Sequence, residues 1–531
     1  MNTRKTLLHL AAAYALCASF SALAANTGEL PCGTTAECAE QARKIGATMD
    51  KAAPKGGAYE SQFSWLNRIN KASIVMLTEE GIVSSEQGRR IAIGVRHAID
   101  QASQPDGNRP SDVLQLERIM IDKIGPEASL IHSGRSRQDM YATYRLAMLR
   151  AQVLDYADAL NTSRTRLLRI ARDNVDTLIP AYTNGVQAMP ITYAHYLLAF
   201  EAAFERDAQR IRELYARLNL SPMGTAVLAN SGWPLNRQRL AVLLGFDGVR
   251  ENSLDSSQVS TFDIPLEAAG IASSSAIRVG ALIGDIHTQY HQTRPWLLLE
   301  EGSTYTSSAM PQKRNPGLLM RTRESASNVV GLAGATTIRA HNVTTGMTDY
   351  KAAFYDLGLF DAATDMFKRL NRVLDALVIN PERAMEELNA EWTTSMELAD
   401  TLEREHSVPF RIGHSFASLI VGQAREQGLL PKDFPYSNAQ KFYVEVAQKY
   451  NWEDQRLPLS EPAFRATLSP RNMVETRKGT GGPQPVEVKR MLAEAGKRLR
   501  ADEHWVSERR QRLIQADAML DRAFSELLPG R

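Results

Sequence analysis

Length, composition and charge narrow the range of possible functions. The chain has 531 residues, 44% of them hydrophobic, enough to bury the cores of two or three domains. Its 62 Lys and Arg residues nearly balance its 60 Asp and Glu residues, giving a formal net charge of +2 at pH 7. That balance argues against a nucleic-acid-binding surface and against a polybasic membrane patch. A small polar molecule is therefore the expected ligand.

Residues 1–24 have the layout of a secretory signal peptide. Arg4 and Lys5 precede an apolar run from Leu7 to Leu23, which closes on the cleavage site Ala22-Leu23-Ala24. A membrane anchor is the alternative, but Ala, Ser and Cys dilute the run and it stops at a cleavable site. We therefore predict export, to the periplasm, of a mature chain that begins at Ala25 and keeps no membrane segment.

Two cysteines follow in segment 25–55, at the start of the predicted mature chain. They are Cys32 and Cys38, whereas Cys17 lies in the part expected to be removed. In an oxidising compartment two nearby cysteines favour a disulfide, because two ligands are too few for a metal site. A pair of inert thiols is the alternative.

Beyond residue 55 the sequence predicts helices almost throughout. Apolar residues recur at steps of three and four in two long stretches, 146–160 and 197–218. Alternation typical of strands is scarce, and no short repeat stands out. We therefore expect an all-α fold built around a helical bundle, with these apolar stripes in the core.

Irregular segments interrupt the helices and concentrate polar side chains, as loops on a rigid scaffold often do at catalytic sites. They are residues 131–139, 181–190, 306–317 and 344–354. Their cations, amides and hydroxyls are Arg135, Arg137, Lys313, Lys351, Gln138, Asn184, Asn315, Ser133, Ser136, Thr183, Ser307 and Ser308. This set suits a dicarboxylate, because cations supply charge-assisted bonds and amides fix orientation. An ordinary solvated turn would explain any one segment alone, but not all of them together.

Four stretches of this sequence resemble a known family. SSAMPQKRNP (307–316) is similar to the signature loop of the aspartase/fumarase superfamily. HSGRSRQD (132–139), VPFRIGH (408–414) and GTGGPQPVEV (479–488) are similar to argininosuccinate lyase in particular. The similarity runs in the same order from about Phe63 to about Leu492, leaving out the signal peptide, the cysteine segment and the last helical tail.

The resemblance implies an all-helical subunit of three domains, whose long central helices join those of three other subunits in a homotetramer with a twenty-helix core. Active sites in that family lie at subunit junctions and are built from loops of three chains. The expected segments are a signal peptide (1–24), a secreted cysteine-containing segment (25–55), an N-terminal helical domain (56–134), a central lyase bundle (135–388) and a C-terminal helical domain with an extra tail helix (389–531).

The resemblance also implies a reaction, the anti elimination of fumarate and an amine across an aspartyl C–N bond, without metal or organic cofactor. Removing the proton next to the carboxylate places two negative charges on that group, as an aci-carboxylate. Lys313 and Asn315 would hold this charge, together with loop N–H groups. Ser307 would be the base, provided that a nearby cation and N–H groups stabilise its alkoxide. His287 and His291 have the spacing of a metal pair, but no third ligand is evident, so we expect no metal there.

The same resemblance assigns substrate-binding roles to a second group of side chains. Arg137 and Gln138, beside Ser136, would bind a substrate carboxylate, Thr183 would bind the same fumarate half, and Lys351 would lie next to the substrate. Each of these expected roles rests on the position of the residue in the matched segments.

Several positions depart from the family's pattern. Asn184 replaces a histidine that donates or relays a proton, and Met320 replaces the glutamate paired with that histidine. Further departures are Gln138 for Asn, Ser260 for Arg, and Asp349, Phe354 and Leu357 for Tyr, Gln and Lys. The fumarate end of the site is thus retained and the amine end rebuilt. We predict a C–N lyase that releases fumarate from argininosuccinate or a related N-substituted aspartate; the alternative is a secreted binding or structural protein that keeps the fold without catalysis.

Overall fold

The computed structural model describes residues 61–347 and 358–529. The predicted signal peptide and the predicted Cys32–Cys38 disulfide lie outside these ranges. So do Lys351 and the three departures that follow residue 347, Asp349, Phe354 and Leu357.

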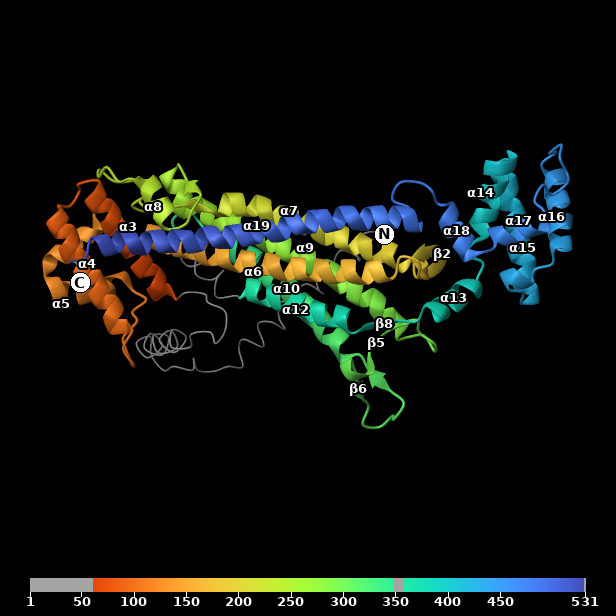
Figure 1. Cartoon of the computed structure of the whole chain (residues 1–531), viewed down its shortest axis with the longest axis horizontal. Coiled ribbons are helices and arrows are strands. Elements are labelled where there is room, and N and C mark those ends of the chain that lie inside the picture. The colour runs from red at the N-terminus through yellow and green to blue at the C-terminus, as the bar shows by residue number, and fades with distance from the viewer. Residues whose placement is uncertain (1–60, 348–357, 530–531) are drawn as a thin grey trace, which may run out of the picture.

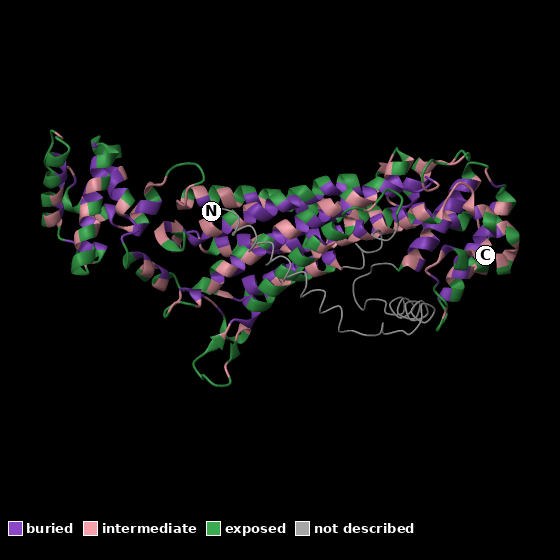
Figure 2. Ribbon diagram, turned by 180° about the vertical axis from the view of Figure 1, so that it is seen from behind, coloured by how far each residue is buried: buried purple, intermediate pink, exposed green. Residues whose placement is uncertain are grey.

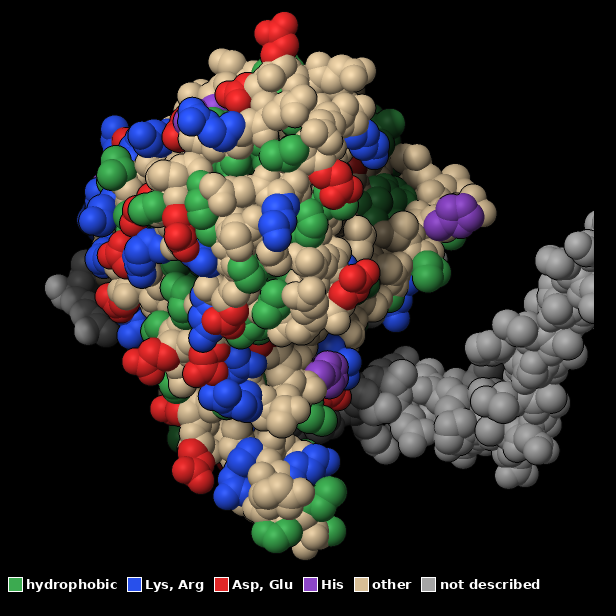
Figure 3. Space-filling model, turned by 90° about the vertical axis from the view of Figure 1, so that its right-hand side faces the viewer, with side chains coloured by type: hydrophobic (Ala, Val, Ile, Leu, Met, Phe, Trp, Pro, Cys, Tyr) green, Lys and Arg blue, Asp and Glu red, His purple; other side chains and the backbone are tan. Residues whose placement is uncertain are grey.

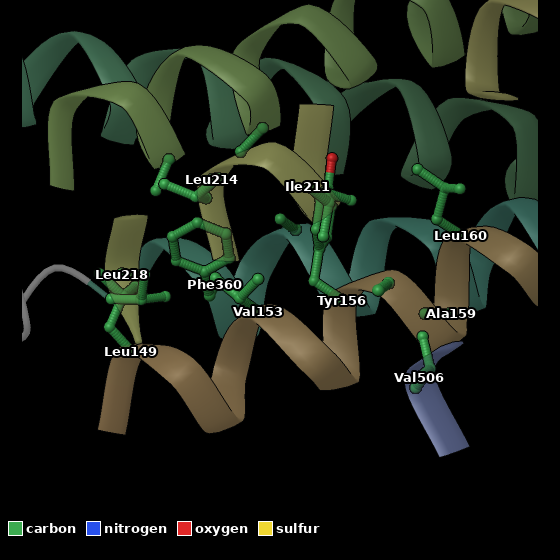
Figure 4. Close-up of a cluster of buried hydrophobic side chains, with 14 of the residues drawn as sticks. Leu149, Val153, Tyr156, Ala159, Leu160, Ile211, Leu214, Leu218, Phe360 and Val506 are labelled. Carbon is green, nitrogen blue, oxygen red and sulfur yellow. The ribbon is translucent and has the colours of Figure 1, made fainter. Parts of the chain in front are cut away.

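Long helices running side by side form the centre of the molecule (Figure 1). Each carries an apolar stripe, and the stripes meet in one continuous core. Figure 4 shows part of this core, where Val153 and Tyr156 meet Ile211, Leu214 and Phe360 from other helices. The helices are α6 (Arg137–Asp173), α7 (Tyr193–Leu218), α9 (Ser260–Gln289), α10 (Gly317–Ala340), α12 (Leu359–Asp375) and α19 (Pro485–Glu526). The predicted all-α class and the central bundle are confirmed.

Smaller helical domains lie at the two ends of the bundle (Figure 1). At one end are α3 (Gln62–Glu79), α4 (Ser85–Ala102), α5 (Val113–Ile124) and α8 (Arg237–Leu243), which share the main core. At the other end, α13 (Pro381–Asn389) leads to a domain with a separate core of its own. Its helices are α14 (Ser395–His406), α15 (Phe410–Gln427), α16 (Tyr436–Lys449), α17 (Glu461–Thr467) and α18 (Pro470–Thr476).

Helix α19 returns from this second domain and runs along the bundle to the first (Figure 1). Its Asp502 carboxylate accepts from Arg164 of α6 at 2.7 Å and from Arg212 of α7 at 3.1 Å. Farther along, the buried side chains of Leu520 and Phe524 join the main core. The predicted tail helix is therefore part of the bundle. Buried residues occur along most of its length, from Val488 through Leu499 and Val506 to Phe524. Figure 2 shows how burial is distributed over the whole molecule, seen from behind.

Four short two-stranded sheets connect the helices within the described ranges. They are β1 (Leu178–Thr183) with β2 (Val186–Thr192), β3 (Leu220–Ser221) with β4 (Gly248–Val249), β5 (Leu297–Leu299) with β8 (Leu377–Ile379), and β6 (Tyr305–Thr306) with β7 (Arg314–Asn315). The expectation of an irregular segment at 181–190 is wrong, because most of it lies in the β1–β2 hairpin. Asn184 (φ 51°) and Gly185 (φ 76°) are both left-handed, as the tight turn of such a hairpin requires.

Candidate active site

The 305–315 segment, here called the signature hairpin, projects away from the bundle at the bottom of Figure 1. Tyr305 pairs with Asn315, and the Ser307 N–H donates to the Lys313 carbonyl at 3.3 Å. Side chains of opposed residues in an antiparallel pair point to the same face, and successive side chains alternate. Ser307, Lys313 and Asn315 therefore share one face of the hairpin with Tyr305, whereas Arg314 belongs to the other face.

The Ser307 oxygen already receives two backbone hydrogen bonds. The N–H groups of Met310 and Ala309 donate to Ser307 Oγ at 3.1 and 3.3 Å. Hydrogen bonds donated to an oxygen favour its anionic form, so this turn helps to stabilise an alkoxide. Lys313 is exposed and Asn315 half-buried, with the Asn315 side-chain amide donating to the Tyr305 carbonyl at 3.3 Å. The hairpin is among the most exposed parts of the described subunit (Figure 2).

Residues 132–139, here called the α6 loop, position the second group of predicted site residues. Ser136 is the N-cap of α6, and its Oγ accepts from the Gln138 N–H at 3.3 Å. Arg137 is exposed in the first turn, with Nη1 3.8 Å from an Asp112 carboxylate oxygen. A helix N-terminus carries partial positive charge, so these side chains flank a suitable place for a carboxylate.

A buried carboxylate fixes the α6 loop, and the sequence analysis missed it. Asp139 Oδ1 accepts from the Ser136 N–H at 2.8 Å, and Oδ2 accepts from the N–H groups of Gly224 and Ala226 at 3.1 and 3.2 Å. Burial raises the pKa of Asp139, while these N–H donors and Arg135 oppose the rise. Its place in the matched motif was visible in the sequence, but its contacts with residues more than 80 positions away were not.

Arg135 also has a structural role, although the sequence placed it among the cations suited to bind a dicarboxylate. Its guanidinium donates to Asn70 Oδ1 at 2.8 Å, to Ser73 Oγ at 2.9 Å and to His132 Nδ1 at 3.2 Å. Burial lowers the pKa of Arg135 to about 10. The residue ties the α6 loop to α3, leaving Arg137 as the exposed arginine of the loop.

Thr183 and Asn184 lie exposed at the turn of the β1–β2 hairpin. The left-handed backbone of Asn184 favours Asn over most residues, which gives this departure from the family's histidine a conformational reason. Nearby at the start of α7, His195 Nε2 lies 2.9 Å from the Gly481 carbonyl. That contact joins the glycine-rich C-terminal motif to the bundle. Met320, in the first turn of α10, is 41% exposed.

One subunit does not bring all of these groups together. Helix α6 has 37 residues and so is about 55 Å long. The α6 loop includes the first turn of this helix and the β1–β2 hairpin follows its other end, so the two lie at opposite ends of the bundle (Figure 1). Ser136, Arg137 and Gln138 thus form one group, Thr183 and Asn184 a second, and Ser307, Lys313 and Asn315 a third.

Charged side chains and candidate metal ligands were considered in the sequence because of the ligands that each could hold. On the face drawn in Figure 3, cationic and anionic side chains are interspersed, with no extended patch of one sign. Within 61–347 and 358–529, no group of three or more His, Cys, Asp or Glu side chains could hold a metal ion. The rings of His287 and His291 stack with centroids 6.3 Å apart.

Comparisons with known proteins extend these observations. A family model described as "Lyase" matches residues 97–331, and one described as "Argininosuccinate lyase C-terminal" matches residues 392–475. The argininosuccinate lyase of Methanocaldococcus jannaschii is 32% identical over 467 residues, covering 85% of this chain and 91% of that protein. Argininosuccinate lyase 1 of Shouchella clausii is 29% identical over 478 residues, with coverages of 88% and 94%.

Solved structures show the same relationship. EDDS lyase in complex with formate superposes with a TM-score of 0.77 at 27% identity, covering 89% of this chain and 96% of that one. A variant of EDDS lyase with bound fumarate gives a TM-score of 0.79 at 28% identity, with coverages of 88% and 92%. The residues matched by the "Lyase" model, 97–331, include helices α6, α7 and α9 and the signature hairpin.

Proposed function

Because the chain belongs to the argininosuccinate lyase family of the fumarase/aspartase superfamily, and so is a C–N lyase, we propose that it eliminates fumarate from an N-substituted aspartate. The observation that carries this proposal is the shared face of the signature hairpin. On it, a serine oxygen with two N–H donors lies beside a lysine and an amide. That combination suits proton removal next to a carboxylate.

In the proposed reaction, Ser307 takes the proton from the carbon next to the substrate carboxylate. The electron pair left behind moves into that carboxylate, and Lys313 and Asn315 stabilise the resulting aci-carboxylate. The pair then returns to form the C=C bond of fumarate as the C–N bond breaks, and the amine leaves with the bonding electrons. Arg137, Gln138 and Thr183 hold the carboxylates, and Lys351 lies beside the substrate.

The amine leaving group follows from the departures at Asn184 and Met320. An asparagine amide forms hydrogen bonds but cannot deliver a proton, so the leaving nitrogen must already carry the proton it needs. The nitrogen of an N-alkylaspartate is cationic at neutral pH and departs as a neutral amine. We therefore propose an alkylamino or diamino succinate as the preferred substrate, ahead of argininosuccinate.

The active site is proposed to form between subunits of a homotetramer. The length of α6 separates groups that must meet on one substrate, so loops from different chains have to supply them. Ile277 of α9 and Ile338 of α10 are 62% and 77% exposed on the central bundle. An added Cβ at Gly270, Gly280 or Gly284 of α9 would meet no atom within 4 Å, so that face leaves room for another helix. Exposed apolar side chains favour association of such faces.

Export to the periplasm remains part of the proposal, with cleavage before Ala25 and a Cys32–Cys38 disulfide. The intact mass of protein recovered from the envelope fraction tests both features. A chain that still carries Met1, or one with two free thiols, would contradict the corresponding half of this prediction.

The activity is tested by following fumarate release by ultraviolet absorbance. The panel contains argininosuccinate, N-butylaspartate, ethylenediamine disuccinate, iminodisuccinate and aspartate. We expect the highest kcat/KM with an alkylamino or diamino succinate. A preference for argininosuccinate would contradict the rebuilt amine end. Binding without fumarate release from any compound would favour the alternative of a non-catalytic binding protein, for which the loss of the histidine–glutamate pair is the supporting observation.

A further inference from the structure

Tyr305 shares the reactive face of the signature hairpin but has no role in the mechanism above. It stands two residues before Ser307 and directly opposite Asn315, so its ring lies on the side that carries the serine oxygen and the lysine. The side chain is 50% exposed and belongs to none of the three hydrophobic clusters among the described residues. An aromatic ring left half-exposed beside reactive groups is available to a ligand.

Gly317 creates the space that this ring occupies. A Cβ placed on Gly317 would lie 2.8 Å from Cε1 and 2.9 Å from Cδ1 of Tyr305, closer than real Cβ contacts come. The Cδ1–Cε1 edge of the ring therefore lies against the first turn of α10, at a position without a side chain. Because the Asn315 amide donates to the Tyr305 carbonyl, the backbone beneath the ring is held as well.

We propose that Tyr305 determines specificity by contacting the N-substituent of the substrate. This inference rests on the proposed function. Lys313 and Asn315 are suited to the substrate carboxylate, for which an aromatic face offers no favourable charge. The remaining part of an N-alkylaspartate is an ammonium with an alkyl group, and a tyrosine face attracts cations and buries alkyl surface. Two strand residues span about 7 Å, a suitable distance between the carbon that loses its proton at Ser307 and an alkyl group beyond the nitrogen.

The contact is tested by calorimetry on a Ser307→Ala background, in which bound substrate is not consumed. The probes are N-butylaspartate and fumarate, which lacks the N-substituent. Adding Tyr305→Ala should weaken N-butylaspartate binding by about tenfold or more and change fumarate binding by less than about twofold. Tyr305→Phe, which keeps the ring, should retain most of the affinity. Gly317→Ala should mimic Tyr305→Ala, because its Cβ displaces the ring.

The outcomes separate this inference from the proposed function. Equal weakening of both ligands, no weakening of either, or dissociation of the assembly in light scattering would overturn the role of Tyr305. So would a background protein that binds neither probe. If the parent enzyme releases no fumarate from any substrate, yet Tyr305→Ala selectively weakens N-butylaspartate, the proposed lyase reaction fails while the contact stands.

Discussion

The α6 loop and the signature hairpin both carry groups expected to bind the same substrate, but they are built in opposite ways. In the α6 loop, Asp139 is buried, Arg135 is half-buried, and both are bonded to several partners. In the hairpin, Ser307 and Lys313 are positioned by one backbone ladder, on a projection that is mostly exposed. The residues expected to bind the substrate carboxylate are thus held by contacts with the core of the subunit. The reacting groups depend on the strand pairing of the hairpin and on the surfaces that pack against it in the assembly.

This difference separates stability from catalysis. A buried charge that loses its partner destabilises the fold, because the remaining group has no water to bind. An exposed side chain can be removed with little effect on folding. Substitutions in the hairpin should therefore change rates, and substitutions in the α6 loop should change the free energy of unfolding.

The largest effect is expected from Ser307→Ala. Removing the base should lower the kcat for fumarate release by about a thousandfold or more, by analogy with the loss of other essential catalytic groups. The urea midpoint and helix content should stay unchanged, because the Ser307 hydroxyl is hydrogen-bonded within its own turn, to the N–H groups of Ala309 and Met310. Thr306→Ala, on the opposite face, is the matched control. A Ser307→Ala enzyme that keeps most of its rate would exclude the serine mechanism.

Lys313→Ala should follow, with a loss of about 10²–10³ in kcat, as when an oxyanion-stabilising group is removed. Its neighbour Arg314 is also exposed and cationic, but it lies on the other face and donates to the Pro311 carbonyl at 2.8 Å. Arg314→Ala should therefore change kcat by less than about threefold. Equal losses from the two substitutions would show that net charge of the hairpin matters, and that its face does not.

The sequence predicted the bundle well because the spacing of apolar residues and the length of each apolar stretch are local properties of the chain. The stripes at 146–160 and 197–218 lie in α6 and α7. The segment with the Met-Pro-Gln-Lys-Arg-Asn motif was expected to be irregular, and the structure shows a short hairpin there. The strands at 181–190 were missed because the residues before the turn show little alternation of apolar and polar side chains. The turn itself is closed by two residues with left-handed backbone. The signature segment has no alternation of apolar and polar residues, so its sequence did not indicate that Tyr305 shares a face with Ser307.

The α6 loop marks a different limit of sequence reasoning. Ser136 and the acidic residue three positions later form a capping box, a local pattern that can be recognised in the sequence. The second function of Asp139, holding the N–H groups of Gly224 and Ala226, depends on how distant segments pack. The spacing of residues along one chain likewise cannot tell which loops meet on a substrate, because α6 keeps two of them apart.

Asp139→Asn should lower the free energy of unfolding by about 2–4 kcal/mol, the range for breaking a buried, hydrogen-bonded charged group. An amide has one acceptor oxygen in place of two, so some of the N–H groups of Ser136, Gly224 and Ala226 would lose their partner. Urea denaturation measures the change. Asp122→Asn, at an exposed position on α5, should stay within about 0.5 kcal/mol of the parent. A similar small change for Asp139→Asn would mean that the α6 loop is no more preorganised than the hairpin.

The smallest effect is expected from pH, through His132 of the α6 loop. Burial, and then the nearby Arg135 charge, lower the pKa of His132 to about 3. The hydrogen bonds agree with a neutral ring, because Nδ1 accepts from Arg135 Nε at 3.2 Å. Its proton then lies on Nε2, which is 3.6 Å from a Glu117 carboxylate oxygen. That carboxylate would favour protonation, but at 3.6 Å it does not outweigh burial and Arg135.

The sign of the pH effect follows from this lowered pKa. Below about pH 6.5 the unfolded chain binds a proton at His132 that the folded protein does not, so stability is lost as pH falls towards 3. Between pH 7 and pH 5 the contribution amounts to about 1–2 kcal/mol. His132→Gln keeps a side-chain acceptor for Arg135 but cannot titrate. Urea denaturation at pH 7 and pH 5 should therefore show a smaller loss of unfolding free energy for His132→Gln than for the parent, by about that amount. Equal losses would mean that His132 is charged and solvated in the folded protein.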